Sequence, residues 1–315
     1  MIELIVNPFI LAFSLFLLAS ASHFTIKSIE KLIGRSGLSE ASVGFVILAV
    51  MTSTPEITVA LFSVLQGEPG ISVGDILGSN VFNMAAVLGI LGMLGYLKTC
   101  CTDLLKELTD ILLITTLIPL LLIISHYHIF DVASPVVGVI LLATFLINTY
   151  LMAKKRTPAI NANVDKTVEK GSLKKAIAML LLTFVGVVIA ARLVVYSGSN
   201  IALFLGIPPI LIGAKVVAIG TSLPELTLDF AAVRRGRVQL AIGDVIGSNL
   251  TNLTLVLGLV LLVSPFAVDM TIFTEILPFL MITTIIFWRF LTRGGVSQVG
   301  GIVLTMTYIL FQAVT

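Results

Sequence analysis

Long apolar runs recur along the whole chain and are separated by short polar segments. Each run has about twenty residues, the length that an α-helix needs to cross roughly 30 Å of bilayer hydrocarbon. The pattern predicts ten spans, near residues 4–26, 41–65, 72–96, 108–126, 132–153, 174–197, 209–233, 239–263, 271–291 and 297–314. The first run, Ile5 to Ala21, has no basic segment before it, so we interpret it as a span and not as a cleaved signal peptide.

The composition agrees with an all-α polytopic membrane protein. Of the 315 residues, 57% are hydrophobic and only 11% are charged, and the mean hydropathy is +1.12. Soluble domains carry roughly twice that charged fraction. We therefore expect the lipid bilayer as the surroundings, no nucleic-acid partner and a functional monomer. Cys100 and Cys101, the two cysteines, are adjacent and are interpreted as plain reduced thiols.

The basic residues predict the orientation in the cell membrane. If the N-terminus lies outside, alternate loops are cytoplasmic and contain all lysines and arginines except Arg192 and Lys215, which fall within predicted spans. Cytoplasmic loops carry an excess of Lys and Arg. The richest of these loops is "AKKRTPAINANVDKTVEKGSLKK" at residues 153–175. The pattern predicts an outside N-terminus and a cytoplasmic central loop.

Two pairs of segments align without gaps at the same offset. "VGFVILAVMTSTPEIT" at 43–58 matches "IGAKVVAIGTSLPELT" at 212–227, and "VGDILGSNVFNMAAVLGI" at 73–90 matches "IGDVIGSNLTNLTLVLGL" at 242–259. Each half has five predicted spans, and an odd number places the second half upside down in the membrane. Such inverted repeats are typical of secondary transporters, which bind their substrates where the repeats meet.

The repeat divides the chain into three parts. We expect a first five-helix repeat at 1–153, a basic cytoplasmic linker at 154–173 and a second, inverted five-helix repeat at 174–315.

Each repeat places a proline and a glutamate inside an apolar span. The proline removes a backbone N–H, and within a membrane the freed carbonyls persist only at a cavity or beside a partner. We expect the carbonyls of Ala49 and Ala218 to be freed in this way. A glutamate inside a span indicates a functional site by default. The oxygen-bearing side chains of these motifs are those of Thr52, Ser53 and Glu56, and of Thr221, Ser222 and Glu225.

The span after each motif adds further oxygen donors on one helical face. Asp75, Ser79 and Asn83 are spaced i, i+4 and i+8, and the second repeat has the same spacing in Asp244, Ser248 and Asn252. An all-oxygen set suits hard cations such as Ca²⁺ and Na⁺. The absence of His and Cys from these stretches argues against zinc or copper. For Asp75 and Asp244 two interpretations stay open: a vestibule that attracts cations at each mouth, or structural hydrogen bonding.

Four other positions within the spans have separate interpretations. Gly78 and Gly247 are small residues that allow close helix packing. Lys215 is a snorkelling or paired cation. Asp229 has Ala60 at the matching position of the first repeat, so we interpret it as a polar partner.

The paired motifs resemble the α-repeats of the cation/calcium antiporter superfamily, which includes Na⁺/Ca²⁺ and H⁺/Ca²⁺ exchangers. The resemblance covers both halves, and its most specific parts are "TSTPE…GDILGSNVFN" and "GTSLPEL…GDVIGSNLTN". It implies four cation sites near the membrane midplane with Glu56 and Glu225 as central ligands, and a sliding of the first and sixth spans during alternating access. The other ligands that it implies are Thr52, Ser53, Ser79, Asn83, Thr221, Ser222, Ser248, Asn252 and the carbonyls of Ala49 and Ala218.

Differences from the family pattern refine the predicted function. Met51 stands where the second repeat has Gly220, so the first motif is a variant. Asn252 stands where potassium-dependent members carry Asp, which argues against K⁺ co-transport. The Thr-Ser-x-Pro-Glu form favours Na⁺ over H⁺ as the counter-ion. We therefore predict Ca²⁺/Na⁺ exchange; the alternative is H⁺/Ca²⁺ exchange with Glu56 and Glu225 as proton carriers.

Other functional classes fit the sequence less well. A cation channel is expected to build symmetric selectivity rings from several subunits, whereas this chain carries its own internal symmetry. We find no nucleophile–base pair, HExxH motif or Walker A motif. The expected protein is a transporter without a cofactor, not an enzyme.

Overall fold

The computed structural model describes residues 44–65, 69–98, 102–129, 133–154, 177–186, 188–190, 212–264 and 270–315, with a few single residues elsewhere. All regular structure in these ranges is helical. Most of the predicted first span, part of the sixth and nearly all of the central basic linker lie outside the described residues.

The described helices of the first half follow the predicted spans closely. They are η1 (Gly44–Leu48), α3 (Ala49–Thr52), α4 (Thr54–Leu65), α5 (Pro69–Val81), η2 (Phe82–Val87), α6 (Leu88–Met93), α7 (Asp103–Leu117), α8 (Leu120–His126) and α9 (Ser134–Lys154). The label η denotes a π-helix, in which the backbone hydrogen bonds run from i to i+5.

The second half repeats this order. Its described helices are η3 (Ile212–Val217), α12 (Ala218–Thr221), α13 (Leu223–Arg234), α14 (Val238–Thr251), η4 (Asn252–Val256), α15 (Leu257–Val263), α16 (Met270–Thr292) and α17 (Gln298–Val314). Within the described ranges, five continuous helical stretches are long and apolar enough to cross a bilayer: Pro69–Met93, Asp103–His126, Ser134–Leu151, Val238–Val263 and Phe273–Thr292.

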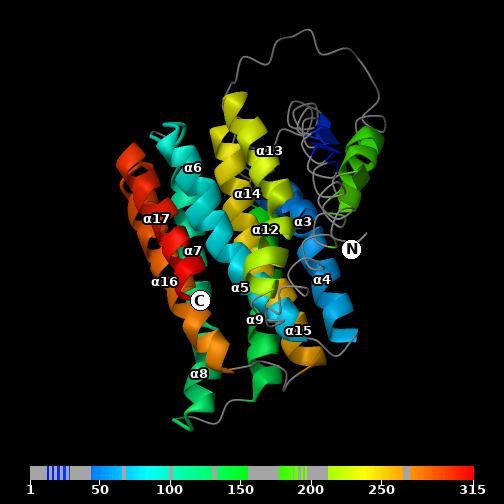
Figure 1. Cartoon of the computed structure of the whole chain (residues 1–315), viewed down its shortest axis with the longest axis vertical. Helices are drawn as coiled ribbons and strands as arrows, with labels where there is room; N and C mark the ends of the chain where they lie inside the picture. Colours follow the sequence, from blue (N-terminus) through cyan, green and yellow to red (C-terminus); the bar gives the residue numbers. More distant parts are fainter. Residues whose placement is uncertain are drawn as a thin grey trace, which may run out of the picture.

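Equivalent helices of the two halves run in opposite directions. In Figure 1 the cyan α5 and α6 rise toward the upper end, whereas the yellow α14 and gold α15 descend toward the lower end. The contacts also correspond, because α5 packs against η3 and α12 while α14 packs against η1 and α3. Each central helix therefore lies against the proline–glutamate segment of the other repeat.

Two glycines allow this close approach, as the sequence predicts. A Cβ atom on Gly78 would lie 2.7 Å from Cα of Ala214, and one on Gly247 would lie 2.9 Å from the carbonyl oxygen of Phe45. Neither space can hold a methyl group without a backbone shift. The packing interpretation of Gly78 and Gly247 is confirmed.

A second pair of glycine contacts joins the outer helices. A Cβ atom on Gly301 of α17 would lie 2.6 Å from the carbonyl oxygen of Gly89, and one on Gly138 of α9 would lie 2.9 Å from that of Gly258. Gly89 and Gly258 occupy matching positions of the two repeats. The last helix of each half thus packs against the other half.

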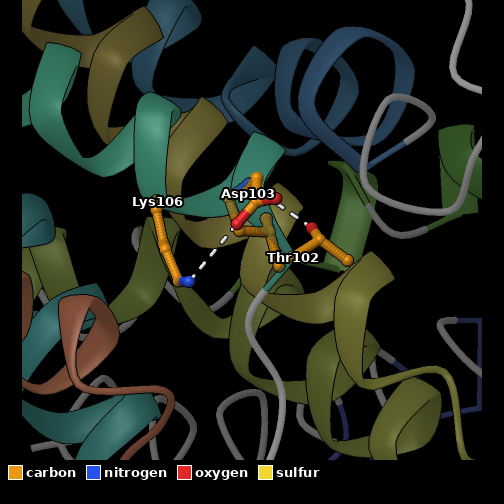
Figure 2. Close-up of polar contacts among 4 residues, drawn as sticks. Thr102, Asp103 and Lys106 are labelled. Carbon is orange, nitrogen blue, oxygen red and sulfur yellow. Dashed lines mark hydrogen bonds and ion pairs between the residues drawn. The ribbon is translucent and has the colours of Figure 1, made fainter.

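One end of the molecule gathers the helix termini that carry basic residues. Thr102 caps α7 by accepting a hydrogen bond from the backbone N–H of Leu105 at 3.4 Å, and Lys106 pairs with Asp103 at 3.3 Å (Figure 2). The backbone N–H of Val296 donates to the carbonyl of Leu97 at 2.8 Å and ties two loops together here. Apart from Lys215, the basic residues of the described ranges lie at or next to such helix ends: Lys98, Lys106, Lys154, Arg234, Arg235, Arg237, Arg289 and Arg293. The cytoplasmic location of this end stays a prediction.

The adjacent glycines of α17 give a matched test of this packing. In Gly301→Ala the new methyl would meet the backbone of α6, whereas in Gly300→Ala it would meet only the ring of Phe290 at 3.1 Å, which can turn aside. We expect Gly301→Ala to lose about 1–3 kcal/mol of stability and Gly300→Ala to stay near the parent.

The measurement is thermal unfolding of the detergent-purified variants, followed by the fluorescence of the single tryptophan, Trp288. Equal melting temperatures for the two alanine variants would contradict the proposed tight contact.

Candidate cation site

Each proline–glutamate motif lies at a helix that is interrupted for one residue. Ser53 (φ −73°, ψ 2°) separates α3 from α4, and Ser222 (φ −86°, ψ 4°) separates α12 from α13. The following helix begins one residue before its proline, so Glu56 and Glu225 lie in its first turn. The helix interruption expected at each proline is present and covers one residue.

The prediction that the carbonyls of Ala49 and Ala218 are freed is wrong. Ala49 O accepts a hydrogen bond from the N–H of Ser53 at 3.0 Å, and Ala218 O accepts one from the N–H of Ser222 at 3.1 Å. Both carbonyls therefore keep their helical donor. The carbonyls four residues before each proline lose theirs, because proline has no N–H. Each carbonyl also has a threonine hydroxyl within hydrogen-bond distance, Thr52 Oγ1 at 3.3 Å from Ala49 O and Thr221 Oγ1 at 3.4 Å from Ala218 O, so its second lone pair already faces a donor.

The two glutamates are fully buried without protein partners. The side chains of Glu56 and Glu225 are 0% exposed, and none of their four carboxylate oxygens has a hydrogen-bond partner. The hydroxyls of Ser53 and Ser222 are likewise buried and unpartnered. A buried charge without compensation is very costly, so these oxygens require a ligand such as a cation or a proton.

Hydrogen bonds across the repeats hold the two aspartates. Thr221 Oγ1 donates to Asp75 Oδ1 at 2.9 Å, and Thr52 Oγ1 donates to Asp244 Oδ1 at 3.2 Å. Both aspartates are 0% exposed. The vestibule interpretation of Asp75 and Asp244 is therefore wrong for this structure, since neither side chain reaches solvent. Their contacts match the hydrogen-bonding alternative.

Side-chain amides also form hydrogen bonds between the repeats. Asn252 Nδ2 donates to Ser79 Oγ at 3.2 Å, and Asn83 Nδ2 donates to Asn249 Oδ1 at 3.3 Å. The Oδ1 atoms of Asn83 and Asn252 have no partner and are buried. Thr52 Oγ1 also lies 3.0 Å from Ser248 Oγ. The structure thus brings the side chains of the predicted ligand set to one interface between the repeats.

Sequence reasoning missed two members of this interface. Asn80 and Asn249 are fully buried, and Asn249 positions Asn83. The signal was present, because both belong to the triplet "GSN" that occurs in each repeat. The i, i+4, i+8 spacing from Asp75 and from Asp244 does not include either position.

Five buried carboxyl groups gather around this interface. They are Glu56, Asp75, Glu225, Asp229 and Asp244, all 0% exposed. Glu225 interacts electrostatically with Glu56, Asp244 and Asp229, and Asp75 interacts with Glu56.

No lysine or arginine of the described ranges pairs with these five groups. Lys215, the basic residue in η3, donates instead to the backbone carbonyl of Gln312 at 3.0 Å. Within the described residues, the negative charge of these groups when ionised is therefore left for a bound cation or a proton to offset.

The donor set determines what kind of ion fits. The unpartnered atoms are carboxylate, hydroxyl and amide oxygens, which are the ligands of hard cations. In the described part of the chain, no three His, Cys, Asp or Glu side chains are close enough together to hold a metal alone. A bound cation would therefore also need hydroxyl, amide and carbonyl oxygens.

Comparison with known proteins agrees with this geometry. The family model described as "Sodium/calcium exchanger protein" matches residues 6–154 and 175–315. Sodium/calcium exchanger MaX1 of Methanosarcina acetivorans is 30% identical over 98% of this chain and 98% of its own length. Inner membrane protein YrbG of Escherichia coli is 27% identical over 88% of this chain and 86% of its own.

A solved structure shares the fold. The sodium-calcium exchanger NCX_Mj, soaked with Na⁺ and Sr²⁺, superposes with a TM-score of 0.80 at 26% identity, covering 99% of both chains. This likeness confirms the all-α membrane fold of ten spans in two inverted repeats. The chain belongs to the sodium/calcium exchanger protein family, and it is a cation/Ca²⁺ antiporter and not an enzyme.

Proposed function

We propose that this antiporter exchanges Ca²⁺ for Na⁺ by alternating access, with both ions bound between the repeats. The observation that carries the proposal is the set of four unpartnered carboxylate oxygens on Glu56 and Glu225. These groups lie in matched positions of inverted segments, where transporters of this architecture bind their substrates.

The proposed ligands surround the two glutamates. The unpartnered hydroxyls of Ser53 and Ser222 and the amide oxygens of Asn83 and Asn252 are the most available of them. Completing the proposed set are Thr52, Ser79, Thr221, Ser248 and the backbone carbonyls of Ala49 and Ala218.

Exchange follows from the charge of the shared ligands. One Ca²⁺ neutralises both glutamates, and two or three Na⁺ can do the same, so the two kinds of ion exclude each other. An empty site leaves carboxylates buried without compensation, which is costly. We infer that the protein reorients readily only when ions are bound, and this requirement couples the two fluxes without ATP.

The proposed topology gives the transport its direction. The chain consists of a first repeat at 1–153, a basic linker at 154–173 and a second repeat at 174–315. With the N-terminus outside, the linker lies in the cytoplasm, and inward Na⁺ flow drives Ca²⁺ out of the cell. Sliding of the first and sixth spans would open the site to each side in turn. A single chain contributes both halves of the site, so we propose that the monomer is the functional unit.

The glutamates give the first test. We expect proteoliposomes loaded with Na⁺ to take up ⁴⁵Ca²⁺, and Glu56→Gln or Glu225→Gln to abolish the uptake, because the amide cannot neutralise Ca²⁺. The matched control is Glu275→Gln, which changes an exposed glutamate of α16 and should keep the parent rate. Uptake at the parent rate in both site variants would contradict the proposal.

The counter-ion gives the second test. The same vesicles are loaded with choline in place of Na⁺ and are then exposed to a step in pH. We expect no uptake without internal Na⁺, whatever the pH step. Uptake driven by the pH step alone would replace Na⁺ with H⁺ as the counter-ion, with Glu56 and Glu225 as proton carriers.

A further inference from the structure

Asp229 adds a negative charge to the second repeat that the first repeat does not have. Its side chain is 0% exposed, and neither carboxylate oxygen has a hydrogen-bond partner. The matching position of the first repeat is Ala60, which is 4% exposed. The two halves of the molecule therefore differ by one buried carboxyl group.

The fold places Asp229 beside Asp244. Helices α13 and α14 form an antiparallel pair joined by a short turn at 235–237, and they pack against each other (Figure 1). Asp229 lies six residues before this turn and Asp244 seven residues after it, so a rise of about 1.5 Å per residue brings both to the same level. The two carboxyl groups are close enough to interact electrostatically.

The pair has unused ligand capacity. Asp244 Oδ1 accepts from Thr52 at 3.2 Å and lies 3.5 Å from Ser248 Oγ, whereas Asp244 Oδ2 has no partner. Together with Asp229, three carboxylate oxygens are buried and unpartnered here. Two carboxylates side by side repel each other in a medium of low dielectric constant, and no lysine or arginine of the described ranges offsets their charge.

We propose that Asp229 and Asp244, with the hydroxyls of Thr52 and Ser248, form a Na⁺ site that has no counterpart around Asp75, where Ala60 replaces the second carboxyl group. It lies between Glu225 and the arginine-bearing turn. The three unpartnered carboxylate oxygens and the two hydroxyls give five oxygen ligands, whereas Ca²⁺ takes six to eight, so a monovalent cation fits better. The identity of the ion rests on the proposed Na⁺ exchange.

The test is equilibrium binding of ²²Na⁺ to the full-length purified protein without Ca²⁺ and at fixed pH. Asp229→Asn should bind one Na⁺ fewer per chain. The Na⁺ concentration needed to release half of the bound ⁴⁵Ca²⁺ should rise by about tenfold. This is the change in affinity expected when one charge-assisted contact is lost. Asp229→Glu keeps the carboxylate and should bind the parental number of Na⁺ ions.

The matched control removes a carboxylate that lies elsewhere. Asp110 is exposed and accepts a hydrogen bond from Trp288 Nε1 at 2.6 Å, so Asp110→Asn should bind the parental number of Na⁺ ions. Where Asp229→Asn is not monodisperse, Asp244→Asn tests the same site from its other carboxyl group and should also lose one Na⁺.

An unchanged number of bound Na⁺ in a folded Asp229→Asn would overturn the site. If the pH dependence of Na⁺ binding changed at the same time, the pair would hold a shared proton in place of Na⁺. The proposed function is tested separately: a parent that shows no Na⁺-driven ⁴⁵Ca²⁺ uptake would refute the exchange, yet a Na⁺ lost in Asp229→Asn would still support the site.

Discussion

Two hydrogen bonds between the repeats, from Thr221 to Asp75 and from Thr52 to Asp244, hold the ion-binding interface together. Each joins an interrupted helix of one repeat to the central helix of the other. Because each acceptor is a buried carboxyl group, losing its donor costs about 1–3 kcal/mol or more. The glutamate that follows each threonine is therefore held against the opposite repeat, and neither half can form the site alone.

Four π-helical segments accompany this interface in matched places. η1 and η3 lie immediately before the two motif helices α3 and α12, while η2 and η4 follow the central helices α5 and α14. A π-helical turn contains an extra residue, which changes the direction of the side chains after it, and such turns are frequent at functional sites. The ligand face of α5 and α14 ends where η2 and η4 begin, near Asn83 and Asn252, so the extra residues turn the following apolar positions toward the packed core.

The repeat made most of the site predictable from the sequence. Aligning the halves pairs Glu56 with Glu225, and the helical spacing of Asp75, Ser79 and Asn83 predicts the face that meets the other half. Periodicity states which side chains share a face, but not what lies opposite them. The partner of Asp75 is 146 residues away, and no local pattern encodes that contact.

The two mistaken predictions have related physical causes. The carbonyls of Ala49 and Ala218 were expected to be free because each precedes a proline, but only the carbonyl four residues before a proline loses its donor. The burial of Asp75 and Asp244 was missed because a carboxylate near a helix start suggests solvent. Each instead faces a hydroxyl from the other repeat, so tertiary contacts decide its environment.

The departures from symmetry lie in the site and not in the scaffold around it. The glycine contacts Gly78–Ala214 and Gly247–Phe45 correspond in the two halves, whereas Asn252 donates to Ser79 and Asn83 donates to Asn249. For an antiporter built from inverted repeats, a symmetric scaffold makes the two membrane orientations similar in packing energy. Differences among the ligands then give the two orientations different ion affinities, and a difference in affinity is what allows bound ions to shift the balance between them.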